Sequence, residues 1–173
     1  MALTPDEEQL AEAMAGELDG RQTIEWTVHP AEVFLIIGAL QTVLHHPDAT
    51  FFQKKLFAGI VFLLRHHLPD GPIQAFIDEG QKPIQEQRDP SNADQEAVAE
   101  ALHAVGPTTI PISNIHAYTI ISAIQVAHRH PHMEDFARER LDNVADTLTA
   151  AIGGSAMKKA IALGWENTRR TQA

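Results

Sequence analysis

The sequence predicts a mostly α-helical, all-α fold, in which a helical bundle is built from two related helix-Pro-helix hairpins. Helix start and stop signals recur along the chain, and the apolar residues between them follow helical spacing. The stretch LIIGALQTVLHHP at 35–47 also returns, at an offset of 84, as TIISAIQVAHRHP at 119–131. Two such hairpins can bury their apolar faces against each other, so we expect them to pack about a pseudo-two-fold axis.

The first part of the chain carries signals for two helices with an extended stretch between them. Thr4 precedes a proline and three acidic residues, which predicts a helix that ends at Gly20. Residues 21–28, RQTIEWTV, favour an extended conformation. His29 stands before a second proline, with a glutamate three residues after it, which predicts a capped helix over 30–46. A His-Pro dipeptide ends this helix, because proline cannot continue it.

The helix expected over 49–68 is apolar around much of its circumference, so we expect it to lie at the centre of the bundle. LPDGP at 68–72 has the composition of a turn, and the PIQAFIDEGQ segment that overlaps its end favours a short helix. Residues 81–94 contain two prolines and few apolar side chains. We interpret them as an exposed linker.

The second half of the chain carries signals of the same kind. Ser91 and Asp94 form a capping box for a helix that closes at Gly106, and PTTIPI after it favours an extended stretch. Ser113 caps the helix expected over 114–130, which a second His-Pro dipeptide ends. Two further helices are expected, from residue 132 to the glycine pair at 153–154 and from Ser155 onward.

Length and composition limit the classes of protein to which the chain can belong. The 173 residues can bury one core, so we expect a single helical domain over 1–173 with repeat units at about 27–68 and 111–152. A formal net charge of −10 argues against broad nucleic-acid binding, which requires clustered Lys and Arg. No apolar run reaches the roughly 18 residues of a membrane span. The first residues lack a basic signal-peptide region, so we expect a cytoplasmic protein with no membrane partner.

Ten histidines are a large number for this chain, and seven of them gather in three clusters, LHHPD, LRHHLPD and AHRHPHM. One interpretation is a metal site of His46 and His130, which the repeat matches, with His45, His128 or His132 beside them. The other is that these rings stabilise the carbonyl ends of helices. The spacings HExxH, ExxH and HxH are absent from single helices, and there is no cysteine. We therefore expect no metal and no cofactor.

Two glutamines, Gln41 and Gln125, occupy matching positions on helices that we expect to be buried. A buried amide without partners costs roughly 1–3 kcal/mol, so each must bind something. Their amides either bond to each other or to the backbone and fix helix register, or they face a shared pocket. Basic groups at the helix breaks could receive phosphate or carboxylate there, or could pair with the interleaved acids. The candidate ligand-binding residues are Gln41, Gln125, His46, His130 and Arg129.

Common enzyme signatures are absent from the sequence. It contains no GxSxG elbow, no GxGxxG after a strand and no acidic calcium-binding loop. We therefore expect no catalytic residues and a protein that is not an enzyme.

The stretch WTVHPAEVFLIIGALQTVLHHPD resembles a segment, roughly HPAEVF-IGALQ-A-RHP, of small proteins of bacteriophages and prophages, especially those of actinobacteria. The similarity covers about 25–30 residues, and AIQVAHRHP is a weaker second match. It implies a small accessory protein in the host cell cytoplasm, and several phage proteins of this size bind host molecules or immune nucleotide signals. The function of these proteins is unassigned, so the resemblance transfers no catalytic residues. The residue two before the proline is His45 in the first copy and Arg129 in the second.

Three functions are compatible with these patterns. We favour a non-enzymatic protein that binds a small polar ligand, such as a nucleotide signal, between the duplicated hairpins. The alternative is a protein–protein interaction or assembly protein, whose duplicated face binds a host or virion protein or forms a homodimer. A His-based metalloprotein is the third.

Overall fold

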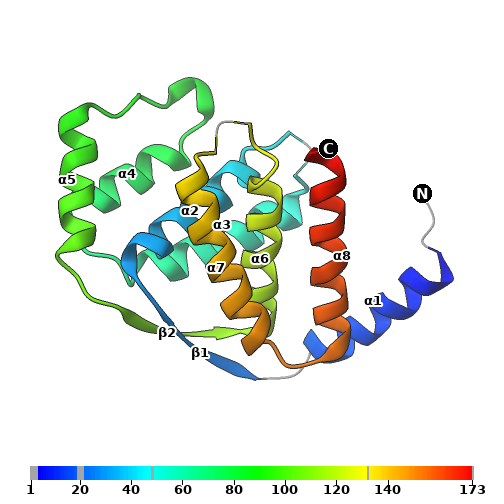
Figure 1. Ribbon diagram of the computed structural model, residues 1–173. Coiled ribbons are helices and arrows are strands. Elements are labelled where there is room, and N and C mark those ends of the chain that lie inside the picture. The colour runs from blue at the N-terminus through cyan, green and yellow to red at the C-terminus, as the bar shows by residue number, and fades with distance from the viewer. Residues whose placement is uncertain (1–3, 19–21, 48, 132, 173) are drawn as a thin grey trace. The chain divides into compact units, whose positions relative to one another are not determined.

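The computed structural model describes residues 4–18, 22–47, 49–131 and 133–172 of the chain. Helices make up 72% of the molecule, and the sheet has two strands, which confirms the mostly α-helical fold. The elements, labelled in Figure 1, are α1 (Pro5–Leu18), β1 (Thr23–Val28), α2 (Pro30–Leu44), α3 (Phe51–Arg65), α4 (Pro72–Gln81), the 3₁₀ turn η1 (Ile84–Glu86), α5 (Asn92–His103), β2 (Thr108–Ser113), α6 (Asn114–Ala127), α7 (Asp135–Ala151) and α8 (Ser155–Gln172).

The helix caps expected from the sequence are present. The His29 ring accepts a hydrogen bond from the backbone N–H of Ala31, and the side chain of Glu32 accepts one from the backbone N–H of His29. Ser91 caps α5 in a capping box, and the Ser113 hydroxyl accepts from a backbone N–H in the first turn of α6. Gly20, the expected end of α1, lies outside the described residues. Local hydrogen-bonding rules therefore explain where these helices begin.

The chain divides into two compact units, and the single helical domain expected from the sequence stays a prediction. We call residues 1–26 with 111–173 the terminal unit, and residues 27–110 the middle unit. Strands β1 and β2 pair with each other, and the chain passes from one unit to the other within both strands. The expected repeat segments, 27–68 and 111–152, each fall within one unit.

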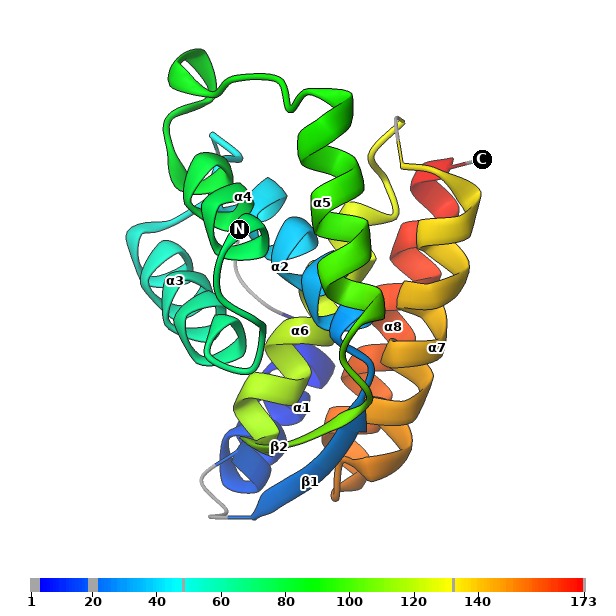
Figure 2. The same ribbon diagram turned by 90° about the vertical axis from the view of Figure 1, so that its left-hand side faces the viewer.

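Helix α2 organises the middle unit. It packs against α3 and also contacts α4 and α5 (Figure 2). Its sequence is almost wholly apolar, and Ile36 and Leu40 on it are fully buried with Ile60 of α3 and Ile77 of α4. Residues 82–91, within the segment interpreted as a linker, contain only η1 and are exposed along their length.

Helix α3 does not lie at the centre of its unit, so the expectation from its composition was wrong. It buries one face, which includes Phe57 and Ile60, and exposes three large apolar side chains on the other. Phe51, Phe52 and Phe62 are 74%, 71% and 65% exposed. Apolar content alone could not reveal this, because it does not say which neighbours exist to cover a second face.

The terminal unit is organised around α6, which contacts both α7 and α8 (Figure 1). Helix α1 packs on α8, where the Glu17 carboxylate accepts hydrogen bonds from the backbone N–H groups of Ala156 and Met157 at 3.0 and 2.8 Å. A carboxylate at this position satisfies two open donors of the first turn of α8 and interacts favourably with the helix dipole. This contact joins two elements that are far apart in the sequence.

Within the described part of the chain, no helix combines the length and the apolar character that crossing a membrane requires.

The His116 ring, in the first turn of α6, gives the terminal unit a pH dependence. Burial lowers the pKa of His116 below its ordinary value of 6.5. Folding therefore favours the neutral ring, so its contribution to stability is present above pH 6.5 and is lost as pH falls through the lower folded pKa. We expect an NMR titration of this ring to have its midpoint below 6.5, and His116→Gln to flatten the pH dependence of unfolding in this range. A midpoint above 6.5 would contradict the assignment.

Candidate functional site

The two matched glutamines bind backbone carbonyls inside their own units. The Gln41 amide of α2 donates to the carbonyl of Ile77 in α4 at 2.9 Å. The Gln125 amide of α6 donates to the carbonyl of Ile161 in α8, also at 2.9 Å. Each amide reaches 36 residues along the chain. The Gln41 side chain therefore fastens α4 to α2, and the Gln125 side chain fastens α8 to α6, which is the backbone-bonding alternative that the sequence left open.

A glycine gives each amide its space. A Cβ atom at Gly80 would lie 2.4 Å from Oε1 of Gln41, and one at Gly164 would lie 2.3 Å from Oε1 of Gln125. Real Cβ contacts do not approach so closely, so any side chain at these positions would displace the amide. The glutamine, the carbonyl-bearing residue and the glycine have the same sequence spacing in both units. The two sets are related by the offset of 84 that also relates the two repeated stretches.

The other predicted site residues lie at the ends of α2 and α6. His46, His130 and Arg129 are exposed. Arg129, His130 and Gln125 belong to the terminal unit, whereas Gln41 and His46 belong to the middle unit. A ligand site shared by all five residues stays a prediction.

The rings next to them make the closer contacts. His45 Nε2 lies 2.8 Å from the carbonyl oxygen of Gly80, within the middle unit. His128 Nε2 lies 2.5 Å from Oδ1 of Asp142, within the terminal unit. His132, which the metal interpretation also named, lies outside the described residues. Among the residues that the structure describes, no group of three His, Asp or Glu side chains is arranged to hold a metal ion.

A polar hollow of about 360 Å³ lies in the terminal unit, where α6 ends against α7 and α8. Two carboxylates one turn apart on α7 face it, together with an aromatic ring and a guanidinium four residues apart on α8. We call it the α7–α8 pocket, lined by His128, Asp142, Asp146, Trp165, Thr168 and Arg169.

His128 is fixed in this pocket from two sides. Its side chain is 11% exposed and its Nε2 faces the Asp142 carboxylate, which is itself 47% exposed. The Trp165 ring meets the imidazole edge to face, with centroids 5.2 Å apart and planes at 87°. Such geometry holds both rings in place. A molecule in the hollow can then contact the other carboxylate oxygen of Asp142, the indole of Trp165 and the side chain of Arg169.

Thr168, the hydroxyl-bearing residue of the lining, is occupied by the fold. It is 1% exposed, and its Oγ1 lies 3.0 Å from the carbonyl of Gly164 and 3.4 Å from that of Gln125. A hydroxyl that is buried and donates to a helix carbonyl is poorly placed as a nucleophile. The lining offers charged groups, hydrogen-bonding groups and an aromatic surface.

The corresponding positions of the middle unit carry no charged side chains. At an offset of 84, the positions of His128, Asp142 and Asp146 carry Leu44, Ala58 and Phe62 in the middle unit. Trp165 and Arg169 correspond to glutamines there. Leu44, Ala58, Phe62 and the glutamine at position 81 lie in helices of the middle unit, and the glutamine at position 85 lies in η1, so α2, α3 and α4 form without these charges.

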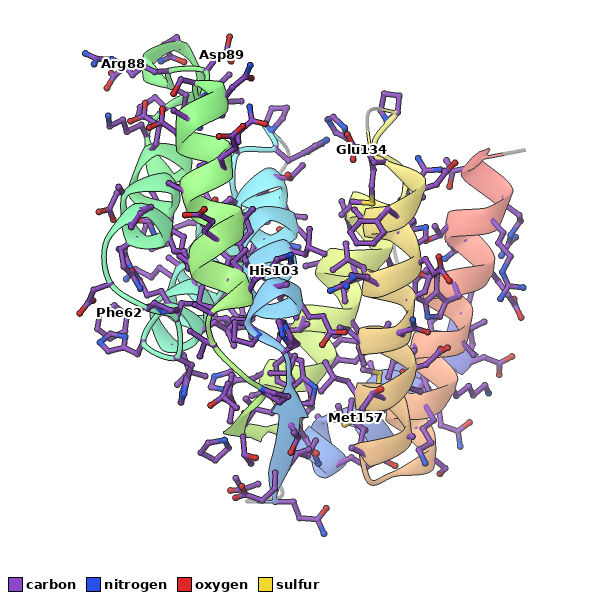
Figure 3. The ribbon with its side chains drawn as sticks, turned by 60° about the vertical axis from the view of Figure 1, so that its left-hand side comes forward. Phe62, Arg88, Asp89, His103, Glu134 and Met157 are labelled. Atoms are coloured by element: carbon purple, nitrogen blue, oxygen red, sulfur yellow. The ribbon has the colours of Figure 1, made fainter. Side chains whose placement is uncertain are left out.

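A second hollow, of about 440 Å³, lies in the middle unit between α4, the 82–91 segment and α5. Two of its three acids, Glu79 and Asp94, are engaged in hydrogen bonds with that segment. The Lys82 ammonium and the backbone N–H of Arg88 hold the pKa of Glu79 below its usual 4.5, and the Ser91 cap lowers the pKa of Asp94. Figure 3 shows Arg88 at the outer end of this region. We therefore regard the α7–α8 pocket as the stronger candidate.

Sequence reasoning found His128 as a neighbour of its candidates but missed Asp142, Asp146, Trp165 and Arg169. A weak signal existed, since each pair lies at i, i+4 on one helix. Nothing in the spacing indicated that the two helices meet beside the end of α6.

No family model matches this chain, and no curated protein or solved structure matches it either.

Proposed function

We propose that the protein is a non-enzymatic binding protein, and that the α7–α8 pocket of its terminal unit takes a small polar ligand with an anionic group and a flat ring, such as a nucleotide. The observation that carries the proposal is the convergence of Trp165, Arg169 and two aspartates in one hollow of ligand size. The sequence patterns favour a ligand between the two hairpins, whereas the α7–α8 pocket lies within one unit.

Each side chain of the lining suits one part of such a ligand. The indole of Trp165 offers an aromatic surface for a flat ring. The Arg169 guanidinium suits a phosphate or carboxylate, because its N–H groups can bind two oxygens at once. The carboxylates of Asp142 and Asp146 accept hydrogen bonds from amino or hydroxyl groups. A volume of about 360 Å³ is near the lower limit for sites of drug-sized molecules.

Binding without turnover fits the pocket better than catalysis. The Thr168 hydroxyl is already bonded to helix carbonyls, and His128 has no nucleophile of the lining beside it to activate. The resemblance to small phage and prophage proteins supports a role in capturing a signal in the host cell cytoplasm.

Trp165 provides a direct readout of binding. The chain has two tryptophans, and Trp26 is buried, with 3% exposure. The Trp26→Phe variant therefore keeps Trp165 of the pocket as its single tryptophan. We expect one member of a panel of linear and cyclic nucleotides to change this fluorescence saturably and to be recovered intact. Arg169→Ala should raise the dissociation constant about 10- to 100-fold, which corresponds to losing one or two charge-assisted hydrogen bonds.

The neighbouring Arg170 supplies the matched control. Its guanidinium donates to Asn167 and does not line the pocket, so Arg170→Ala should leave the affinity unchanged. Equal losses in Arg169→Ala and Arg170→Ala would indicate nonspecific attraction. No response to any nucleotide would contradict the nucleotide assignment, and conversion of a bound nucleotide would contradict a non-enzymatic role.

A further inference from the structure

The face of α3 that points away from α2 is an apolar and basic surface without acidic residues. We call it the outer α3 face and define it by Phe51, Phe52, Lys55, Ala58, Gly59, Phe62 and His66. Its three phenylalanines are 65–74% exposed, and they are three of the seven in the chain. Figure 3 shows Phe62 pointing outward from its helix. Contiguous exposed aromatic side chains typically mark an interaction surface.

The residues at the centre of this face have small side chains or none. Ala58 and Gly59 lie midway between Phe51 and His66, and also midway between Lys55 and Phe62, on the same side of the helix. Glycine in a helix interior is less stable than alanine. A Cβ atom at Gly59 would meet no other atom within 4 Å, so the fold of the chain does not require glycine there. Small residues at such a point allow a second helix to approach closely.

The surface is complementary to itself. Suppose that two α3 helices cross antiparallel over Ala58 and Gly59. Each residue of one copy then faces the residue of the second copy for which the two residue numbers add up to 117. Phe62 then meets Lys55 of the second copy, and Phe51 meets His66 of the second copy. Lys55 already lies over an aromatic ring within the chain, 4.7 Å from the Phe51 centroid, and His66 packs edge-on against Phe62. The same side chains can therefore make cation–π and aromatic contacts across a two-fold axis.

We propose that the outer α3 face is a homodimer interface, in which α3 of one copy crosses α3 of a second copy at Ala58 and Gly59. The phenylalanines supply about 400 Å² of surface per copy, roughly half of what a stable interface buries on each partner. The dimer is consequently weak and depends on concentration. This inference is independent of the α7–α8 pocket.

Sedimentation equilibrium of the full chain, from low micromolar to about 1 mM, tests the proposal. We expect a monomer–dimer equilibrium that Phe62→Glu weakens more than tenfold. Gly59→Leu is the most discriminating variant. Leucine favours the helix and adds apolar surface, so nonspecific association would increase, whereas the crossing proposed here leaves no room for it. We expect Gly59→Leu to be folded by circular dichroism and monomeric.

Phe136 of α7 provides the matched control, because it is a 63% exposed phenylalanine in the other unit. Phe136→Glu should leave the association constant unchanged. The proposal is overturned if the wild type is monomeric throughout the range, if Gly59→Leu associates as well as the wild type, or if Phe136→Glu weakens association as much as Phe62→Glu.

Discussion

Replacement of Gln125 by alanine is expected to lower the free energy of unfolding by about 3 kcal/mol. Gln125 is 7% exposed, and its amide is bonded to the Ile161 carbonyl of α8. The variant loses this hydrogen bond and leaves a cavity between α6 and α8. Urea denaturation followed by far-UV circular dichroism measures the change, and helix α8 should become the least protected part of the terminal unit in hydrogen exchange.

Gln41→Ala is the natural comparison for this variant. Gln41 makes the equivalent bond to Ile77 but is only half-buried, so water can replace part of what is lost. We expect a cost of about 1 kcal/mol. Exposed Gln9 in α1 serves as the neutral reference. If Gln125→Ala is no more destabilising than Gln9→Ala, the buried amide does not fasten α8.

Alanine at Gly164 is expected to destabilise the wild type by about 2 kcal/mol and to stabilise the Gln125→Ala variant by about 1 kcal/mol. A Cβ atom at position 164 would lie within 3.0 Å of three atoms of the Gln125 amide, so the bonded amide must move. Once the amide is gone, the space is open and the higher helix propensity of alanine remains. The sign of the effect therefore reverses between the two backgrounds.

A double-mutant cycle of these two positions measures the coupling. The account requires a coupling of about 2–3 kcal/mol, which is near the upper end for residues in contact. Gly80→Ala in α4 should behave in the same way with Gln41 but more weakly, because the half-buried amide can turn toward solvent. Additive effects at Gln125 and Gly164 would show that the close approach is relieved by a small shift of the side chain.

Local features of the fold could be predicted from the sequence because their causes are local. His29, Ser91 and Ser113 cap their helices through hydrogen bonds that span two or three residues, so the residue types and spacing suffice. The extended stretches before α2 and α6 followed from β-branched residues and proline in the same way. The carbonyl partners of Gln41 and Gln125 lie 36 residues away, and no local rule indicates them.

The candidate site could be predicted only in part for the same reason. His128 was visible within a histidine cluster, but Asp142 and Trp165 join it through the packing of three helices. The exposure of Phe51 and Phe62 on α3 was missed because composition counts apolar residues without showing which face has a neighbour. Tertiary contacts thus determine which residues line the α7–α8 pocket and which face of α3 stays exposed.

Native mass spectrometry of the chain purified from its source cells tests the binding function most directly. The account predicts a mass above that of the polypeptide by one small, intact molecule. The added mass should be retained by Arg170→Ala and lost in Arg169→Ala and Trp165→Leu, because only the last two change the lining of the α7–α8 pocket. A bare polypeptide mass from source cells, or an added molecule that Arg169→Ala and Trp165→Leu retain in full, would contradict the account.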